Sequence, residues 1–332
     1  MLSIDWFVYA FVRKEAVISS QIEGTQCTLI DLLNLEAEAG NEAAANDDMR
    51  EVCNYLDALK YARKELGAKH GLPISMRLLN KSHRLLMRGV RGANKLPGEV
   101  RRSQNWIGGT RPGNASFVPP PPHRLAELLA DFEHYVHNGN ELPVLIRAGL
   151  LHVQFETLHP YLDGNGRIGR LLVTLLLEHH GVLSAPLLYL SLFFKRNRQE
   201  YYRRLGAVRS EGDWEGWTKF FLEGVATISE EAVELVRDAL ALVNADRKKV
   251  LNAKTSTLLA ARLFEALPKN PVLSIPSAMR LLETTRPTAA MAVKALVDAE
   301  VLVETTGRKR DQRFSYAAYL DLLRVGTELE GA

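Results

Sequence analysis

A chain of 332 residues, 46% apolar and 24% charged, can bury a sizeable core, and its length favours two folded units or one large one. Its formal net charge of +3 excludes a chain-wide basic field of the kind that draws nucleic acid, so such a contact needs a local patch. Two cysteines, Cys27 and Cys53, are too few for a disulfide framework or a four-ligand zinc site, and they favour a reducing, cytoplasmic setting.

The first predicted element is a helix over residues 1–22. This segment is apolar, but charged residues from Asp5 onward interrupt it well short of a membrane span, which needs about 18 uncharged apolar residues. No other stretch comes close to that length, so we expect no membrane partner. Gly24 suits the left-handed position that ends a helix, which places Glu23 at the helix terminus.

Most of the following chain carries apolar residues at helical spacing, as in Ala148, Leu151 and Phe155. The protein is therefore predicted to be mainly α, with a helical bundle as its larger domain. Helices are expected over residues 47–66, 75–87, 123–137, 142–158, 167–180, 198–208 and 214–240.

One segment of the bundle, residues 92–122, is rich in glycine and proline and is expected to form turns. Within it, Gln104–Ile107 and Ala115–Val118 flank a glycine-rich turn. This arrangement predicts a short β-hairpin flap at about residues 102–119. An exposed hairpin edge can hold another chain by strand addition.

Residues 250–326 follow a different pattern, with three short helices and then two strands separated by a basic turn. The expected helices cover residues 260–267, 275–282 and 287–299, and the expected strands cover residues 301–304 and 313–316. This is the order of a winged helix-turn-helix domain, with residues 307–310 as the tip of the wing.

The basic residues of this predicted domain form a candidate DNA-binding patch. They are Arg280, Arg286, Lys294, Arg308, Lys309, Arg310 and Arg313. The expected recognition helix, residues 287–299, is poor in the Arg, Asn and Gln side chains that read bases, so specific operator recognition is unsupported. DNA binding and a role as a protein-interaction or homodimer module are equally open.

The most distinctive segment is residues 159–170, HPYLDGNGRIGR. Its glycines, Gly164, Gly166 and Gly169, match the G-x-G-x-x-G pattern of dinucleotide-binding folds. That fingerprint requires a preceding strand and an acidic residue about 20 positions later within a βαβ unit. Here the preceding residues are predicted to be helical and no parallel strands follow, so we reject a dinucleotide site.

The same residues are suited to a phosphate site at the start of a helix. Gly164 and Gly166 let backbone N–H groups approach an anion at the helix N-terminus. Arg167 and Arg170 are three residues apart and share a helix face, where they can clamp more than one phosphate group. Asp163 places a carboxylate beside them, as Mg²⁺ bound to a polyphosphate requires.

His159 is the candidate general base, because an imidazole with a pKa of about 6.5 accepts a proton near neutrality. A base, a cation and a phosphate cradle together indicate attack of a hydroxyl group on phosphorus. On these residues alone, phosphoryl transfer and nucleotidyl transfer both remain open.

The segment HPYLDGNGRIGR resembles the Fic signature H-P-F-x-D/E-G-N-G-R-x-x-R and departs from it only at Tyr161, which stands where the signature has Phe. The added hydroxyl needs a hydrogen-bond partner if the ring is buried. The similarity extends over residues 1 to about 245. It implies N-terminal helices with an inhibitory helix over residues 1–90 and a catalytic core over residues 91–245.

The resemblance implies a protein adenylyltransferase. His159 would deprotonate a Ser, Thr or Tyr hydroxyl of a target protein, which attacks the α-phosphate of ATP and expels pyrophosphate. Asp163 would hold the Mg²⁺ cofactor. The implied ATP contacts are Gly164, Asn165, Gly166, Arg167, Ile168, Gly169 and Arg170. A relative that reverses the nucleotide and acts as a kinase carries A-N-K where this chain has G-N-G, so AMP transfer is expected.

The sequence SSQIEG, from Ser19 to Gly24, matches the inhibitory pattern S/T-x-x-x-E-G/N of the same family, with Ser19 and Glu23 at its fixed positions. A Glu23 carboxylate paired with Arg170 would occupy the fork that the γ-phosphate needs, so we expect self-inhibition. Removal of AMP from a modified protein, with Glu23 positioning water, is an alternative activity. A DNA-binding transcriptional regulator whose Fic domain senses nucleotide is the alternative outside the enzyme class.

Similar proteins carry N-x-x-x-Y-Y after the signature, which Asn197, Tyr201 and Tyr202 match here. Tyr202 is expected against the adenine with Asn197 nearby, and one tyrosine of the pair is expected to pack in the core. Three side chains of the flap are expected to pin the target segment: Trp106, Ile107 and Phe117.

Other arginine and histidine side chains receive no functional role from the sequence. Arg101 and Arg102 are expected on a solvated face, because exposed arginine clusters are common. His83 and His152 are interpreted as ordinary hydrogen-bonded residues, since neither has chemical partners nearby in the sequence.

Overall fold

The computed structural model describes residues 4–37, 45–138, 141–255, 257–308 and 310–329. Helices dominate these residues, as the spacing of apolar side chains predicts. None of the helices in the described ranges is long and apolar enough to cross a membrane.

The described residues group into two units. One unit consists of residues 18–25 and 50–229, and the other draws on residues 1–17, 26–49 and 230–332. Two helices, α1 (Ile4–Ile22) and α10 (Trp214–Asn252), contribute residues to both units. The end of α1 that carries Ser19 therefore belongs to the same unit as the signature.

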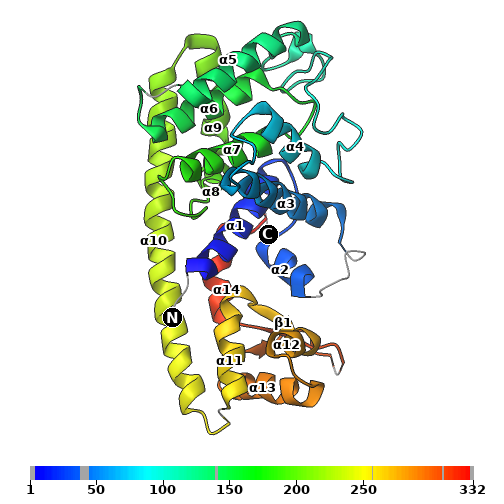
Figure 1. Ribbon diagram of the computed structural model, residues 1–332, viewed down its shortest axis with the longest axis vertical. Coiled ribbons are helices and arrows are strands. Elements are labelled where there is room, and N and C mark those ends of the chain that lie inside the picture. Colours follow the sequence, from blue (N-terminus) through cyan, green and yellow to red (C-terminus); the bar gives the residue numbers. More distant parts are fainter. Residues whose placement is uncertain (1–3, 38–44, 139–140, 256, 309, 330–332) are drawn as a thin grey trace. The chain divides into compact units, whose positions relative to one another are not determined.

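The unit of residues 18–25 and 50–229 is a helical bundle built around α6 (Val144–Leu158) and α7 (Asn165–His179). These two helices lie side by side (Figure 1), and nearly all of α7 is buried. From Leu171 to Leu177 the helix is apolar on all sides except at Thr174, and such a helix belongs at the centre of a bundle. The helices around this pair are α3 (Asp47–Gly67), α4 (Met76–Leu86), α5 (Leu125–Asn138), α8 (Ser191–Arg196) and α9 (Arg198–Glu211).

The predicted helices of the bundle are present, but α10 is longer than expected. It continues past residue 240 to Asn252, and the buried side chains of Ala239, Val243 and Val250 keep the helical period over the extension. Neither glycine nor proline interrupts residues 225–252, so no helix-breaking residue supports the predicted end. The short helix α8 was not predicted.

The predicted hairpin flap is reduced to a single bridge. Ile107 pairs with Phe117, with the Ile107 N–H donating to the Phe117 carbonyl at 2.9 Å. The expected strands therefore do not form a ladder. Gly108 and Gly109 take positive φ angles directly after the bridge, and Pro119 begins a proline run that has no N–H groups to extend the pairing.

The second unit contains the predicted order of helices and strands after residue 250. Its helices are α11 (Leu258–Ala266), α12 (Ile275–Leu282), α13 (Arg286–Asp298) and α14 (Ala317–Arg324), and its strands are β1 (Val272–Ser274), β2 (Val303–Glu304) and β3 (Arg313–Ser315). The strands form an antiparallel sheet in the order β1-β3-β2, with Val272 and Val303 both opposite Ser315. The three-residue strand β1 and helix α14 were not predicted.

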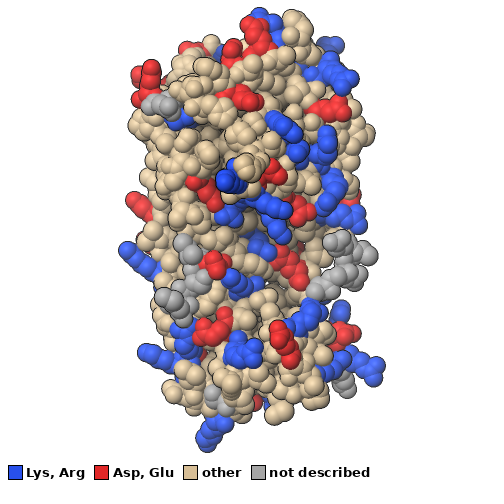
Figure 2. Space-filling view, in the orientation of Figure 1, with Lys and Arg blue, Asp and Glu red and all other residues tan. Residues whose placement is uncertain are grey.

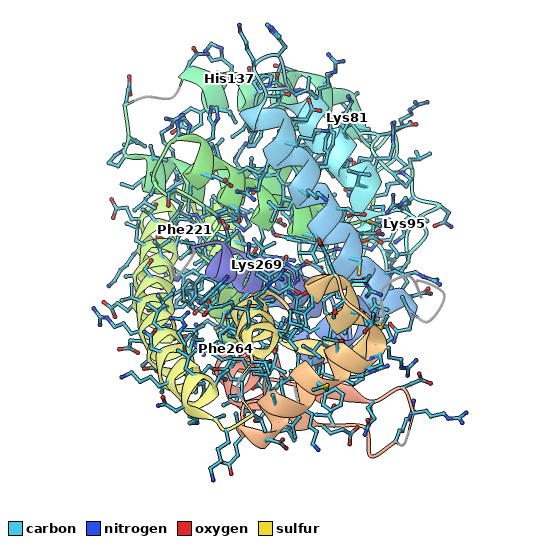
Figure 3. The ribbon with its side chains drawn as sticks, turned by 60° about the horizontal axis from the view of Figure 1, so that its bottom comes forward. Lys81, Lys95, His137, Phe221, Phe264 and Lys269 are labelled. Atoms are coloured by element: carbon cyan, nitrogen blue, oxygen red, sulfur yellow. The ribbon has the colours of Figure 1, made fainter. Side chains whose placement is uncertain are left out.

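Helix α2 (Leu29–Ala37), which was not predicted, and the first part of α1 complete this unit. Arg13 lies over the Tyr9 ring at 3.4 Å and binds Glu36 of α2 through Nε and Nη2, each at 2.8 Å. Within the core of the unit, Phe264, labelled in Figure 3, packs against Tyr316. The Tyr316 hydroxyl donates to the buried Asp246 carboxylate of α10 at 2.7 Å.

Candidate active site

His159 is the residue at which α6 ends, and its backbone is held in a strained conformation. Its φ of 47° lies in the left-handed region, which non-glycine residues rarely adopt. Arg101 stabilises this turn, because its Nε donates to the His159 carbonyl at 2.9 Å and its backbone N–H donates to the Pro160 carbonyl at 2.8 Å. The expectation that Arg101 is solvated is wrong: the residue is 2% exposed.

The imidazole of His159 is arranged to accept a proton through Nε2. Its Nδ1 lies 3.4 Å from the Glu156 carbonyl oxygen, which can only accept a hydrogen bond, so the neutral ring carries its proton on Nδ1. Burial lowers the pKa of His159 to about 4, and the nearby Arg209 guanidinium acts in the same direction. The ring is therefore neutral at pH 7, as a general base must be.

Tyr161 and Asn165 fix the loop between α6 and α7. The Tyr161 N–H donates to Asn165 Oδ1 at 2.9 Å, and Asn165 Nδ2 donates back to the Tyr161 carbonyl at 2.8 Å. The Tyr161 ring is fully buried, and its hydroxyl donates to Asn80 Oδ1 at 2.8 Å. The hydrogen-bond partner expected for the hydroxyl of this position is therefore present.

His83 of α4 packs against this loop, and the sequence did not predict this role. Its ring stacks on Tyr161 with centroids 3.9 Å apart. The Gly98 N–H donates to Nδ1 at 2.8 Å, so Nε2 carries the proton and donates to the Asp163 carbonyl at 2.9 Å. Burial lowers its pKa to about 4. The available signal was its place on the buried face of α4, which Leu79 shares.

The phosphate cradle that the sequence predicts falls on the first turn of α7. Gly164, with a φ of 75°, precedes the helix, and the Ile168 N–H is the first to return to a carbonyl of this turn, that of Gly164, at 3.1 Å. The backbone N–H groups of Asn165 and Gly166 therefore lie at the end of the helix, where they can meet an anion. The helix begins two residues before the predicted start at Arg167.

Two of the expected ATP contacts lie away from this cradle. Ile168 is fully buried in the core, and Gly169 packs so closely on Glu156 that an added Cβ would collide with its carboxylate. The Asn165 side chain is used within the loop. The structure thus brings Gly164, Gly166 and the Asn165 backbone together, and leaves Ile168 and Gly169 in packing positions.

Arg170 is held by the end of α1. Its Nε donates to Ser19 Oγ at 2.8 Å, and its Nη2 donates to the Ser19 carbonyl at 2.9 Å and to Glu23 Oε1 at 2.7 Å. The Arg170 side chain is 2% exposed and the Glu23 side chain 34% exposed. A Cβ built at Gly166 would collide with Glu23 Oε1, so this carboxylate lies directly against the cradle.

The charges of this pair stabilise each other. Burial by itself raises the pKa of Glu23, but the Arg170 guanidinium outweighs it and holds that pKa below its usual range. Burial likewise lowers the pKa of Arg170, and Glu23 more than reverses the effect. The pairing of Glu23 with Arg170 that the sequence predicts is present in the structure.

Arg167 pairs with a different carboxylate, Glu51 of α3. Its Nη1 donates to Glu51 Oε2 at 3.0 Å, and both side chains are buried. Glu51 also accepts from Arg91 Nε at 2.8 Å and from Thr25 Oγ1 at 3.1 Å. Glu51 was not predicted, because it lies far from the signature along the chain and no local pattern marks it.

Asp163 lies beside the cradle and is paired with a lysine side chain. Its Oδ1 accepts from the Gly164 N–H at 2.7 Å, and its Oδ2 accepts from Lys95 Nζ at 2.8 Å. Lys95, labelled in Figure 3, lies on the loop that follows α4. Burial raises the pKa of Asp163, but the Lys95 ammonium outweighs it and the net shift is downward. Among the described residues, no group of three or more His, Cys, Asp or Glu side chains could hold a metal ion.

Sequence comparisons agree with this geometry. Residues 73–177 match the Fic/DOC family, and residues 1–64 match the N-terminal region of the Fic/DOC family. The chain belongs to the Fic/DOC family. A protein adenylyltransferase Fic from Drosophila grimshawi is 31% identical to this Fic-family chain over 231 residues, which are 67% of the chain and 43% of the relative. The chain thus spans less than half the length of the curated relatives it matches.

Solved structures share the fold. A Fic family protein from Desulfovibrio desulfuricans G20 superposes with a TM-score of 0.58 at 23% identity, covering 92% of this chain and 86% of that one. A Fic domain containing signaling protein from Bacteroides thetaiotaomicron VPI-5482 gives a TM-score of 0.55 at 20% identity, covering 68% and 86%. The likeness to the first structure extends through most of this Fic-family chain.

The aromatic residues expected near adenine separate into a core and a surface residue. Tyr201 is 1% exposed, and its hydroxyl lies 2.8 Å from His152 Nε2, so it is the tyrosine that packs in the core. Tyr202 is 44% exposed. Partial burial raises its pKa, and the Glu23 carboxylate acts in the same direction. Asn197 joins α8 to α9 and donates to the Phe193 carbonyl at 3.0 Å.

The flap residues lie close to the catalytic turn. Phe117 lies under the Arg209 guanidinium at 4.4 Å, and Arg209 Nη2 donates to the Glu156 carbonyl at 2.9 Å, the same oxygen that orients His159. Ile107 is half-buried and paired with Phe117, whereas Trp106 is 39% exposed. The flap therefore carries one exposed aromatic side chain, that of Trp106, and its Phe117 lies on the guanidinium that binds the Glu156 carbonyl.

Proposed function

We propose that this chain transfers AMP from ATP to a hydroxyl group of a protein. The hydroxyl proton passes to Nε2 of His159 as the oxygen forms a bond to the α-phosphorus. The bond from that phosphorus to the bridging oxygen of pyrophosphate breaks, and pyrophosphate leaves. The hydroxyl oxygen comes from a Ser, Thr or Tyr side chain of the target.

One observation supports this proposal: a neutral imidazole, oriented through Nδ1, stands at the C-terminus of α6, at the other end of the short loop from the start of α7. A base alone fits many reactions, and a cradle alone fits simple phosphate binding. Together they support attack on a nucleotide phosphate. The choice of AMP as the transferred group is supported by the G-N-G sequence of the cradle and by the names of the Drosophila relatives.

Mg²⁺ is part of the proposal, with Asp163 as its protein ligand. A half-exposed carboxylate beside a phosphate cradle suits this ion, which keeps most of its water and binds through few protein oxygens and the phosphates. When bound, Mg²⁺ would neutralise charge on the phosphates. Lys95 Nζ donates to Asp163 Oδ2 at 2.8 Å, and a carboxylate with about four lone-pair sites can accept Mg²⁺ beside it.

We further propose that the resting chain is self-inhibited. The Arg170 fork is engaged by Ser19 and Glu23, and the Glu23 carboxylate lies against Gly166, where phosphate oxygens would sit. ATP phosphates and Glu23 then compete for the same guanidinium and the same cradle. Tyr202 and Asn197 at the start of α9 are proposed to meet the adenine, and the flap is proposed to hold the target segment.

The test compares three forms with α-labelled ATP and a cell lysate: wild type, Glu23→Gly and His159→Ala combined with Glu23→Gly. We expect weak labelling by wild type, strong labelling by Glu23→Gly and none by the double variant. Equal labelling by the first two forms contradicts self-inhibition, and labelling by the double variant contradicts the role of His159. Release of labelled AMP from modified protein by wild type, lost in Glu23→Gly, would indicate AMP removal instead.

For the second unit, we propose a winged helix used for packing within the chain. The helix and strand order and the antiparallel β1-β3-β2 sheet support this assignment. Two members of the predicted basic patch face α2: Arg280 lines a cavity of about 210 Å³ together with Leu33 and Glu36, and Arg313 Nη1 lies 3.5 Å from Asn34 Oδ1. Lys309 lies outside the described residues.

DNA binding is the competing role of this unit. Among the described residues on the face seen in Figure 2, Lys and Arg side chains are interspersed with Asp and Glu, which weakens the field that DNA binding needs. Filter binding to duplex DNA at several salt concentrations separates the two roles. DNA binding whose affinity falls steeply with salt would favour DNA contact. DNA retention on the filter that stays at the background level at every salt concentration favours packing. Analytical ultracentrifugation of the same samples tests the homodimer.

A further inference from the structure

Glu51 on α3 is a buried carboxylate with three side-chain partners. Its side chain is 2% exposed. Oε1 accepts from Arg91 Nε at 2.8 Å, while Oε2 accepts from both Arg167 Nη1 at 3.0 Å and Thr25 Oγ1 at 3.1 Å. One carboxylate thus joins α3 to the first turn of α7 and to the residue that follows the inhibitory segment.

Arg167 depends on this carboxylate. Its side chain is 4% exposed, and among the described residues its Nη2 meets the Met87 sulfur at 3.6 Å while its Nε has no hydrogen-bond partner. A buried guanidinium without a counter-charge is costly and tends to change position or draw in water. Glu51 is the anion whose contact fixes the orientation of this side chain next to the cradle.

The surroundings of Glu51 differ from those of Glu23, and this difference decides its role. Glu23 is 34% exposed and lies against Gly166, at the start of α7 where the proposed function places the phosphates. Glu51 is almost completely buried, and none of the nearest neighbours of Gly164, Gly166 or Gly169 belongs to it. Glu51 therefore contacts Arg167 from the interior, where it does not compete with phosphate.

We propose that Glu51 is a positioning residue of the nucleotide site, which holds the Arg167 guanidinium toward the phosphates of ATP. This inference rests on the proposed function, since it assigns a task to a residue of the same site. It predicts that loss of the Glu51 charge weakens ATP binding and leaves the chemical step nearly unchanged.

The contact between Glu51 and Thr25 determines which form of the protein is suitable for measuring the effect of Glu51 on ATP binding. Thr25 stands two residues after Glu23 and shares Oε2 of Glu51 with Arg167, so a change at Glu51 also loosens the inhibitory segment. Loosening that segment would help ATP and mask a loss of positioning. The measurement is therefore made in the Glu23→Gly form, in which the competing carboxylate is absent.

The experiment measures KM for ATP and kcat for Glu23→Gly and for the same form with Glu51→Gln. We expect KM to rise roughly tenfold, because a charge-assisted hydrogen bond becomes a neutral one, and kcat to change less than about threefold. The matched control is Glu178→Gln. Glu178 of α7 binds Arg63 of α3 with Nη2 to Oε1 at 2.7 Å, so it also joins these two helices but lies away from Arg167. It is expected to lower Tm without changing KM.

Calorimetric titration of ATP separates this inference from the proposed function. It is done on the His159→Ala, Glu23→Gly form with and without Glu51→Gln, in which no transfer is needed for the signal. A Kd raised about tenfold supports the inference even if no AMP transfer is found. An unchanged or lower KM and Kd in a folded Glu51→Gln form overturns it, because a competing carboxylate would give the lower value.

Glu51→Asp serves if Glu51→Gln does not fold. It retains the charge and withdraws it by one methylene group, which should lengthen the contact with Arg167. KM and Kd for ATP above those of the parent form support positioning. Values equal to the parent form overturn it, since the inference requires that the place of the charge matters.

Discussion

The two signature arginines lie three residues apart on α7, yet each is held by a different helix and for a different purpose. Arg170 meets the end of α1 through Glu23, whose side chain is 34% exposed, whereas Arg167 meets α3 through Glu51, whose side chain is 2% exposed. The exposed carboxylate is partly open to solvent and lies against Gly166, which fits its proposed displacement by ATP. The buried carboxylate has no such exchange and acts as a fixed counter-charge. Burial, more than charge, separates a removable restraint from a structural support.

The largest effect is expected from removing the exposed carboxylate. Glu23→Gly should raise AMP incorporation roughly 10- to 100-fold, because the competing charge-assisted hydrogen bond to Arg170 is lost. Tm should change little, since the pair is partly exposed and Ser19 still binds Arg170. Initial rates with α-labelled ATP and a thermal melt check both points. A large fall in Tm without a gain in rate would show that Glu23 is a structural support like Glu51, and not a removable restraint.

Removing the buried carboxylate should have the opposite profile. Glu51→Ala leaves Arg167 and part of the Arg91 contact without a counter-charge, so we expect a loss of about 3 kcal/mol in the free energy of unfolding. Urea unfolding followed by circular dichroism measures this loss. Arg88→Ala, which breaks a well-exposed pair with Asp57 of α3, is the control and should cost less than about 1 kcal/mol. Equal losses of unfolding free energy in Glu51→Ala and Arg88→Ala would contradict the proposed contrast between buried and exposed pairs.

The residues that the sequence predicts and those that it misses divide in the same way, into exposed and buried parts of the site. The exposed side of the site, from His159 to Arg170 with Glu23, is marked by contiguous motifs whose spacing carries the geometry. The supports come from distant segments: Glu51 lies on α3 and His83 on α4, and only folding brings them to the signature. The side-chain environment of Arg101 was also predicted wrongly, because a charged residue in a loop looks the same in sequence whether it is solvated or clamps a buried turn.

The fold shows a similar pattern. Long helices with a clear period were predicted, including α6 and α7 at the core. The short elements α2, α8 and β1 were missed, since a few residues carry too little periodicity to stand out. The hairpin was predicted from its turn residues, but proline after Phe117 removes the N–H groups that a ladder needs. Local signals thus gave the turn correctly and the pairing only in part.

The interior should also respond to acid. Burial lowers the pKa of His83 and His159 to about 4 and that of His152 to about 3. Between these values and the unfolded pKa of about 6.5, the unfolded chain binds more protons than the folded one, so stability falls as pH falls through this window. Glu156, with a pKa raised to about 7 by burial, acts oppositely and loses its contribution as pH rises through 7. Urea midpoints at pH 7, 6 and 5 should decrease in that order, and the decrease should shrink in His83→Gln. Midpoints independent of pH would contradict buried neutral histidines.

Salt should give the smallest effect and separates the two carboxylates most directly. The partly exposed Glu23 is open to screening, whereas the buried pair of Glu51 and Arg167 is shielded from it. Raising KCl from 0.05 to 0.5 M should therefore relieve self-inhibition by less than about threefold. The measured quantity is the ratio of wild-type to Glu23→Gly rates at each salt concentration, because the ratio cancels the effect of salt on ATP itself. A constant ratio would contradict this prediction. It would mean that the charged groups of Glu23 and Arg170 separate too rarely for salt to screen them, and that the inhibitory segment leaves the site only together with Ser19.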